Sequence, residues 1–176
     1  MKIAHFSDVH ALSLDGARPW QFFNKRVAGY LNLRLNRRDK HPVALFRAIV
    51  DDLNARPVDH VVVTGDLTNL SLRPEFELAR RILDGIRLGP ERVTVIPGNH
   101  DVYDSPRFVV PAHARRRRAD KLAAWHAFAA QLGLPASPYW LRELGEGAIV
   151  CGLDSCNPAL TPMSASGAIP RPTRQT

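Results

Sequence analysis

Three apolar, strand-like segments of this chain each run directly into a short polar motif, and this arrangement limits the fold more than any other feature. The segments cover residues 2–7, 60–66 and 92–101, and the motifs are Ser-Asp-Val-His, Thr-Gly-Asp and Gly-Asn-His-Asp. Helical patterns separate the segments, at residues 42–55 and 74–86. Strand and helix in alternation, with nearly continuous apolar strands, predict an α/β domain around a buried, largely parallel sheet.

Further elements follow from the same kind of pattern. Residues 20–37 carry apolar side chains at a four-residue spacing, which is typical of an amphipathic helix, and residues 118–133 form another helical pattern. Two strand-like runs, 139–144 and 148–154, flank Gly-Glu-Gly and indicate a hairpin. The chain after Asp154 is rich in Pro, Ser and Thr without any period, so we expect it to be irregular or disordered.

Composition supports one folded domain without a membrane span. The 176 residues are 45% hydrophobic, which is enough for a core. No stretch approaches the roughly 20 apolar residues of a membrane helix, and the first residues lack the apolar region of a signal peptide. We therefore predict a cytoplasmic protein. Cys151 and Cys156 fit neither a redox pair nor a zinc ribbon and are interpreted as ordinary thiols.

The net charge of +7 comes largely from two basic clusters, at residues 34–41 and 113–121. Such clusters attract phosphate-bearing partners, and Arg115–Arg118 could bind nucleic acid. A solvated helix face is the favoured interpretation, because no aromatic residues interleave with the arginines as a stacking platform would need.

The first two polar motifs carry the ligand types of a transition-metal site. Asp8 and His10 are two residues apart, so in extended backbone their side chains leave on one face. A carboxylate with an imidazole suits Mn²⁺, Fe²⁺ or Zn²⁺. Asp66 follows Gly65, which permits a sharp turn, and its two oxygens could bridge two metals. Because the carboxyl ends of parallel strands share one edge of a sheet, these side chains are expected to meet.

The third motif adds a neutral ligand and an imidazole. Asn99 offers a carbonyl oxygen for a second metal, His100 can meet a substrate, and Asp101 could fix the orientation of the His100 ring. Each motif taken alone is also a common turn sequence. Their conjunction, each at the end of a strand, favours a site.

Three stretches of the chain resemble the calcineurin-like metallophosphoesterases. They are His-Phe-Ser-Asp-Val-His, Val-Val-Val-Thr-Gly-Asp-Leu-Thr-Asn and Val-Thr-Val-Ile-Pro-Gly-Asn-His-Asp-Val-Tyr. They look most like the bacterial branch that contains cyclic-nucleotide phosphodiesterases. The resemblance covers about residues 1–155. It implies an αββα sandwich of two packed sheets, and hydrolysis of a phosphodiester by a hydroxide that bridges two divalent metals. The substrate would be a small phosphate ester such as a cyclic nucleotide.

The resemblance also implies a role for each motif residue. Asp8 and His10 would hold the first metal, and Asp66 would bridge to the second. Asn99 would bind the second metal. At the reacting phosphate, His100 would assist the leaving group and Asp101 would pair with it.

The later histidines of the family pattern have no counterpart, because no histidine follows His126. The first metal keeps three ligands and the second keeps two, which predicts that one ion binds and that activity is weak or absent. The second sheet would hold only the hairpin. We therefore interpret residues 1–155 as the amino-terminal part of the domain, in a truncated or frame-shifted version, with 156–176 as an irregular tail.

Two further questions stay open at this level. A non-catalytic metal- or nucleotide-binding protein, completed by a partner chain that bears the other histidines, is an alternative to a phosphoesterase. Segment 11–41 could cover the site, form an interface or simply pack as helix. Substrate, metal identity and oligomeric state do not follow from the residues.

Overall fold

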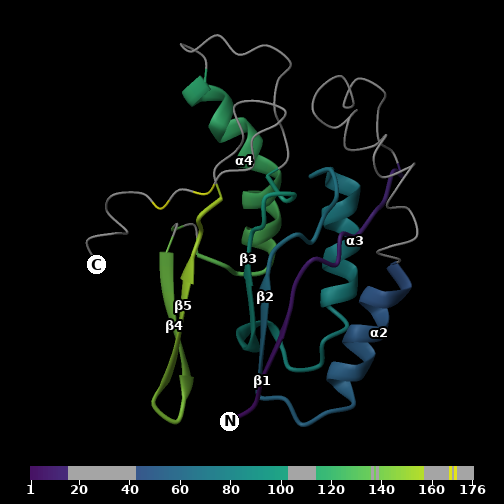
Figure 1. The fold of residues 1–176 in the computed structure, drawn as a ribbon, viewed down its shortest axis with the longest axis vertical. Helices are drawn as coiled ribbons and strands as arrows, with labels where there is room; N and C mark the ends of the chain where they lie inside the picture. Colours follow the sequence, from purple (N-terminus) through teal and green to yellow (C-terminus); the bar gives the residue numbers. More distant parts are fainter. Residues whose placement is uncertain are drawn as a thin grey trace.

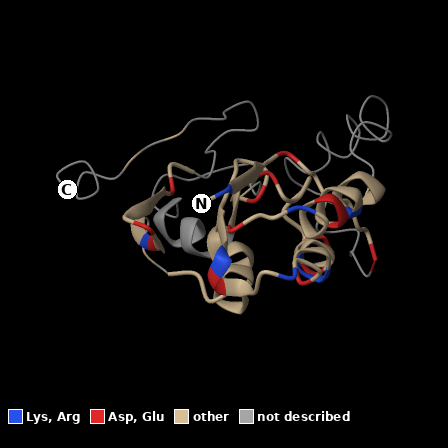
Figure 2. Ribbon diagram, turned by 90° about the horizontal axis from the view of Figure 1, so that it is seen from below, with Lys and Arg blue, Asp and Glu red and all other residues tan. Residues whose placement is uncertain are grey.

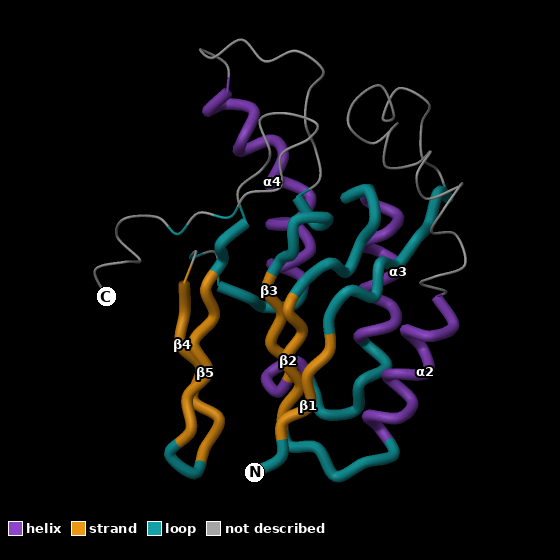
Figure 3. Tube along the Cα trace, viewed as in Figure 1, coloured by secondary structure: helices purple, strands orange, loops and turns teal. Residues whose placement is uncertain are grey.

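The computed structural model describes residues 1–15, 43–102, 114–135 and 139–156, together with the single positions 137, 167 and 169. Side chains of 114–121 are outside the description. The described elements, drawn in Figures 1 and 3, are β1 (Ile3–Phe6), α2 (Val43–Asn54), β2 (His60–Thr64), α3 (Arg73–Leu83), the short 3₁₀ helix η3 (Pro90–Arg92), β3 (Val93–Ile96), α4 (Ala114–Gln131), β4 (Tyr139–Gly145) and β5 (Ala148–Leu153).

The predicted parallel sheet is confirmed. Its strand order is β1-β2-β3, and both strand pairs are parallel, with Phe6 opposite Val63 and Val63 opposite Val95. The helices between the strands provide the long crossovers that parallel pairing needs. All three strands therefore end at the same edge of the sheet, as the sequence analysis expected.

The two faces of this sheet are covered differently. One face packs the side chains of Val61, Val63, Val93 and Val95 into a core with α2, α3 and α4. The opposite face carries His60 and Thr94, which are buried and joined by a 2.8 Å contact from His60 Nε2 to Thr94 Oγ1. Figure 1 shows the β4–β5 hairpin on the side of the sheet away from α2 and α3.

The hairpin is the second, antiparallel sheet that the sequence predicted. Its inner face meets the first sheet through Arg142, whose Nη1 donates to the carbonyls of Glu91 and Val93, each at 3.0 Å. Its outer face leaves large apolar side chains exposed: Tyr139, Leu141, Ile149 and Leu153. The described residues thus form a helical layer, a parallel sheet and a two-stranded sheet, which confirms the α/β class with a small second sheet.

Ion pairs join charged residues on and next to helices α2 and α3. Figure 2 shows basic and acidic residues side by side on them, and the ion pairs Arg56–Asp52, Arg73–Glu77 and Arg80–Asp84 each join positions four apart. The predicted basic cluster 34–41 lies outside the described residues, as do all side chains of the cluster 113–121. The nucleic-acid interpretation therefore stays a prediction.

Several other predictions are tested only in part by the described residues. The helix expected at 20–37 and most of segment 11–41 lie outside the described residues, and so does most of the tail. In the described part of the tail, Cys156 forms a single antiparallel bridge with Gly167. Helix α4 begins at Ala114, earlier than the predicted Arg118. None of the described helices is long and apolar enough to cross a membrane.

Candidate metal centre

The loops that follow β1 and β2 stay paired beyond the ends of the strands. The backbone N–H of Asp8 donates to the Gly65 carbonyl at 3.1 Å, and that of His10 donates to the Asp66 carbonyl at 2.9 Å. A further bond joins Ala11 to Leu67 at 2.7 Å. The first two polar motifs are thereby fixed against each other through backbone atoms, whatever their side chains do.

The third motif is brought in by close contact between two glycines. A Cβ atom built on Gly65, whose φ is +85°, would lie 2.1 Å from the backbone nitrogen of Gly98. A Cβ on Gly98 would lie 2.1 Å from Asp66 Oδ1. Only glycine permits this approach of backbones. The same carboxylate then accepts a hydrogen bond from the N–H of His100 at 2.9 Å, which joins the second and third loops.

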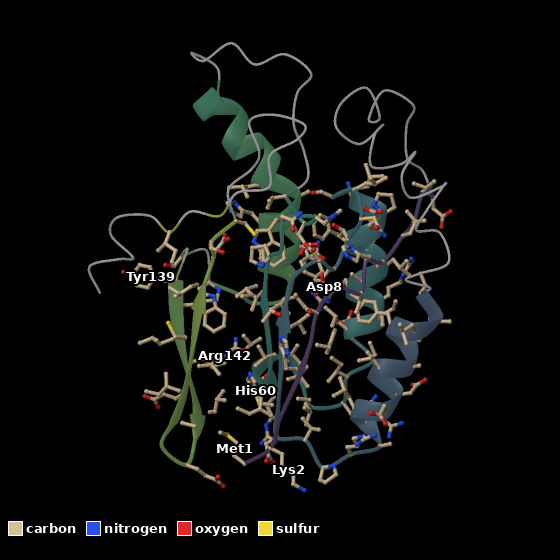
Figure 4. The ribbon with its side chains drawn as sticks, in the orientation of Figure 1. Met1, Lys2, Asp8, His60, Tyr139 and Arg142 are labelled. Atoms are coloured by element: carbon tan, nitrogen blue, oxygen red, sulfur yellow. The ribbon has the colours of Figure 1, made fainter. Side chains whose placement is uncertain are left out.

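The three loops place a compact cluster of possible metal ligands at the sheet edge. Ligand atoms of His10, Asp66 and His100 lie within 4.8 Å of one another. His10 Nε2 is 3.9 Å from Asp66 Oδ2 and 3.9 Å from Asp8 Oδ1. Figure 4 places Asp8 at this end of the molecule, with Met1 and Lys2 at the opposite end.

The residues fit a divalent transition metal. Two ligands at about 2.1 Å from one ion can be separated by about 4.2 Å at most, so the 3.9 Å separations are within reach of a shared ion. The donor set combines imidazole nitrogens with carboxylate oxygens, which suits Mn²⁺, Fe²⁺ and Zn²⁺ rather than a purely hard ion. Asp8 is the solvent-facing member, because its side chain is 62% exposed while that of His10 is buried.

The expectation of extended backbone through the first motif was wrong. Asp8 has φ +58° and His10 has φ +44°, both in the left-handed region, and Asp66 has φ +52°. Non-glycine residues rarely adopt these angles, at a cost of about 1–3 kcal/mol each. The cross-loop backbone bonds explain the difference, because they turn the chain so that successive N–H groups reach the β2 loop.

Both histidine rings have a backbone carbonyl partner in the β2 loop. His10 Nδ1 is 3.2 Å from the carbonyl of Thr68, and His100 Nδ1 is 2.8 Å from the carbonyl of Asn69. The ring centroids are 4.8 Å apart in an edge-to-face arrangement. The orientation of His100 at Nδ1 is thus set by a backbone oxygen, where the sequence analysis had expected Asp101.

The carboxylate of Asp101 instead joins the loop after β2 to the loop after β3 through hydrogen bonds. Its fully buried carboxylate accepts bonds from the backbone N–H groups of Leu67, Thr68 and Gly98 and from the Thr68 hydroxyl, at 2.9 to 3.3 Å. Burial raises the pKa of Asp101 to about 6, a shift that the donors from Gly98 and Thr68 oppose. Its backbone carbonyl accepts a 2.7 Å bond from Ser71.

Two other titratable groups near the cluster are held in neutral form. Burial, and then the charge of His100, lower the pKa of His10, although Asp66 and Asp8 act in the opposite direction. A neutral imidazole keeps a lone pair for a metal. Burial, and then the charge of Asp154, raise the pKa of the Cys156 thiol to about 12, and Cys156 Sγ donates to the Pro97 carbonyl. Cys156 is therefore a structural thiol.

Every residue of the cluster was predicted from the sequence as a site residue, but the residues that support the cluster were not. Asp8, His10, Asp66 and His100 are brought together, and Asn99 is exposed in the same third loop. Thr68, Asn69 and Ser71 were not singled out, yet they are buried and bonded to the site residues. A weak signal existed, because Thr68, Asn69 and Ser71 are interspersed with leucines directly after the second motif.

Comparison with known proteins identifies one family and several relatives. The sequence model of the family described as calcineurin-like phosphoesterase matches residues 1–150. A glycerophosphodiester phosphodiesterase, GpdQ, of Enterobacter lignolyticus (strain SCF1) is 32% identical over 104 residues, which cover 57% of this chain and 30% of that protein. Proteins from two strains of Vibrio vulnificus, named provisionally for phosphoenolpyruvate synthase regulation, are each 34% identical over 73 residues, or 42% of this chain and 26% of theirs. The chain thus spans less than a third of these relatives.

Proposed function

Because the chain belongs to the calcineurin-like phosphoesterase family, we propose that it hydrolyses phosphodiesters with a divalent metal held at the edge of the parallel sheet. The observation that carries the proposal is the cluster of His10, Asp66 and His100, which three separate loops bring within 4.8 Å. A divalent metal bound there supplies Lewis-acid polarisation of a phosphoryl oxygen and makes a water more acidic.

The residues divide into holding and reacting groups. Asp8, His10 and Asp66 hold one ion, with the two carboxylates 3.9 Å from His10 Nε2. Asn99, which is exposed in the same loop as His100, would offer a carbonyl oxygen if a second ion bound near Asp66. The remaining nitrogen of His100, Nε2, can either ligate a metal or, when it is protonated, give a proton to the leaving oxygen.

The test compares a site carboxylate with a carboxylate outside the site. Wild type, Asp66→Asn and Asp59→Asn are assayed with Mn²⁺ on bis(para-nitrophenyl) phosphate, and bound metal is measured in the same samples. Asp59 lies just before β2, at the opposite end of that strand from Asp66, and is exposed. We expect Asp66→Asn to lower turnover by about 100-fold or more and to lose metal, with Asp59→Asn unchanged. Equal turnover after chelation of the metal, or in Asp66→Asn, would contradict the proposal.

The substrate class is the finer part of the proposal. A phosphodiester agrees with the name of the Enterobacter relative, and we propose a small phosphate ester such as a cyclic nucleotide as the candidate substrate. Initial rates on a cyclic nucleotide, a glycerophosphodiester and a phosphomonoester, at equal concentration, separate these classes. A preference for the monoester would argue against phosphodiester hydrolysis.

Metal binding without turnover is the second candidate. Within the described residues, one cluster of three or more His, Cys, Asp or Glu ligands is present, which favours one ion over two. One tightly held metal per chain with no hydrolysis of any ester would support this candidate over the first. Two tightly held metals would contradict the one-ion interpretation.

A further inference from the structure

The two histidines of the cluster are anchored by adjacent residues of one buried loop. Nδ1 of His10 faces the Thr68 carbonyl at 3.2 Å, and Nδ1 of His100 faces the Asn69 carbonyl at 2.8 Å. Thr68 and Asn69 are both buried. Two histidines from different loops, ninety positions apart in the sequence, thus meet consecutive main-chain acceptors.

These contacts decide which ring nitrogen carries the proton. A carbonyl oxygen accepts hydrogen bonds and cannot donate one, so each Nδ1 must be the protonated nitrogen. In a neutral imidazole, the lone pair then resides on Nε2. Nε2 of His10 is the atom that lies 3.9 Å from carboxylate oxygens of both Asp8 and Asp66, so the tautomer presents its lone pair to the cluster.

The side chain of Asn69 connects this loop to the first motif. Its Nδ2 donates to the backbone carbonyl of His10 in a buried hydrogen bond. The neighbouring Thr68 is fixed independently, because its N–H and hydroxyl both donate to Asp101 Oδ1, at 2.9 and 3.0 Å. Asn69 is therefore the residue whose side chain holds the His10 backbone while its own carbonyl holds the His100 ring.

We propose that Asn69 is a positioning residue: its main-chain carbonyl sets the Nδ1–H tautomer of His100, and its side chain holds the His10 backbone so that Nδ1 of His10 meets the Thr68 carbonyl, which leaves the Nε2 lone pair of each ring for a metal ion. The inference rests on the proposed function only for the identity of what the Nε2 atoms bind. The tautomers themselves are a property of the metal-free chain. Partners that orient ligating histidines in this way typically contribute about 10- to 100-fold to metal affinity.

The experiment uses the full chain and two isosteric substitutions. Asn69→Asp replaces the amide donor with an oxygen that meets the His10 carbonyl oxygen. Asn54→Asp is the matched control, because Asn54 Nδ2 donates to the Gly85 carbonyl at 2.8 Å and Oδ1 accepts from Arg87, a similar bridge away from the site. Nitrogen-15 NMR of the histidines, above their ordinary pKa, reports the tautomers without metal, and competition with a chelator reports Zn²⁺ affinity.

We expect His10 and His100 to be Nδ1–H in wild type and in Asn54→Asp. Asn69→Asp is expected to lose this tautomer in one or both rings and to bind Zn²⁺ about 10- to 100-fold more weakly. An Nε2–H tautomer at either histidine in wild type overturns the inference, and this measurement needs no variant to fold. Unchanged tautomers in folded Asn69→Asp overturn it too. If the tautomers behave as expected but the chain binds no metal, the inference about the tautomers is supported and the proposed function is contradicted.

Discussion

The sheet-edge loops and the β4–β5 hairpin use the same backbone conformation for different purposes. Gly65, after β2, has φ +85°, and Gly145, at the end of β4, has φ +86°. A Cβ on Gly65 would lie 2.1 Å from Gly98 N, whereas a Cβ on Gly145 would have nothing within 4 Å. The first glycine is needed for contact between two loops, and the second only turns the chain.

The two regions also differ in what surrounds them. Residues 67–72 form a loop that is buried throughout, which is unusual because loops generally run over the surface. Its polar groups are satisfied by the carboxylates of Asp101 and Glu75, the latter accepting from the N–H groups of Leu70 and Leu72. The hairpin leaves Leu141 69% and Ile149 60% exposed. Burial and buried hydrogen bonds are therefore concentrated where the candidate ligands are.

The largest expected effect comes from substituting these two glycines. Gly145→Ala should lower the free energy of unfolding by about 1–2 kcal/mol, from left-handed strain alone. Gly65→Ala carries the same strain plus the clash with Gly98, so we expect a loss of about 3 kcal/mol or more. Urea denaturation of both variants gives the difference. Equal losses would mean that the contact between the two loops contributes nothing.

The next largest effect is expected from the carboxylate that joins the loops. Asp101→Asn replaces one carboxylate oxygen with an NH₂ group, which then opposes the donor of either Thr68 or Gly98, and unsatisfied buried donors cost about 1–3 kcal/mol each. Asp59→Asn is the control, since exposed Asp59 accepts one 2.6 Å bond from Lys2. We expect destabilisation and weaker metal binding in Asp101→Asn alone. Metal affinity equal to wild type in the folded variant would show that Asp101 supports the fold without shaping the site.

The candidate ligands could be predicted from the sequence because residues of ligand type directly follow the strand-like segments. Asp8, His10 and Asp66 follow apolar runs, and parallel pairing puts those ends together. The backbone angles were not predictable, because Asp8 and His10 become left-handed through bonds to a loop more than fifty positions away. The role of Asn69 was hidden for the same reason: its main-chain carbonyl acts on His100, and any residue type has a carbonyl.

The hairpin was equally visible in sequence, but its attachment to the sheet was not. Arg142 alternates with exposed neighbours as any surface residue would, yet its guanidinium bonds to two carbonyls at the start of β3. Removing both bonds with Arg142→Met should cost about 1–3 kcal/mol. Hydrogen exchange should show faster exchange in β4 and β5, with Zn²⁺ affinity unchanged. A matched loss of metal affinity would mean that hairpin and site are coupled.

The smallest expected effect is a pH dependence where hairpin and sheet meet. Burial, then the charges of Arg142 and Arg92, lower the pKa of His60 from its ordinary 6.5, and Figure 4 shows His60 beside Arg142. The unfolded chain therefore takes up this proton first as pH falls below 6.5, so stability present above that pH is lost until the folded pKa is reached.

The measurement is the free energy of unfolding at about pH 7.5 and about pH 5.5, compared between wild type, His60→Gln and the exposed His126→Gln. His60→Gln should lose part of the decline that wild type shows, while His126→Gln should keep all of it. Arg142→Met should behave in between, because it removes one cause of the shift and leaves burial and Arg92. If instead His60→Gln declined as steeply as wild type, the acid sensitivity would belong to the buried groups of the sheet edge, and the hairpin interface would be insensitive to pH.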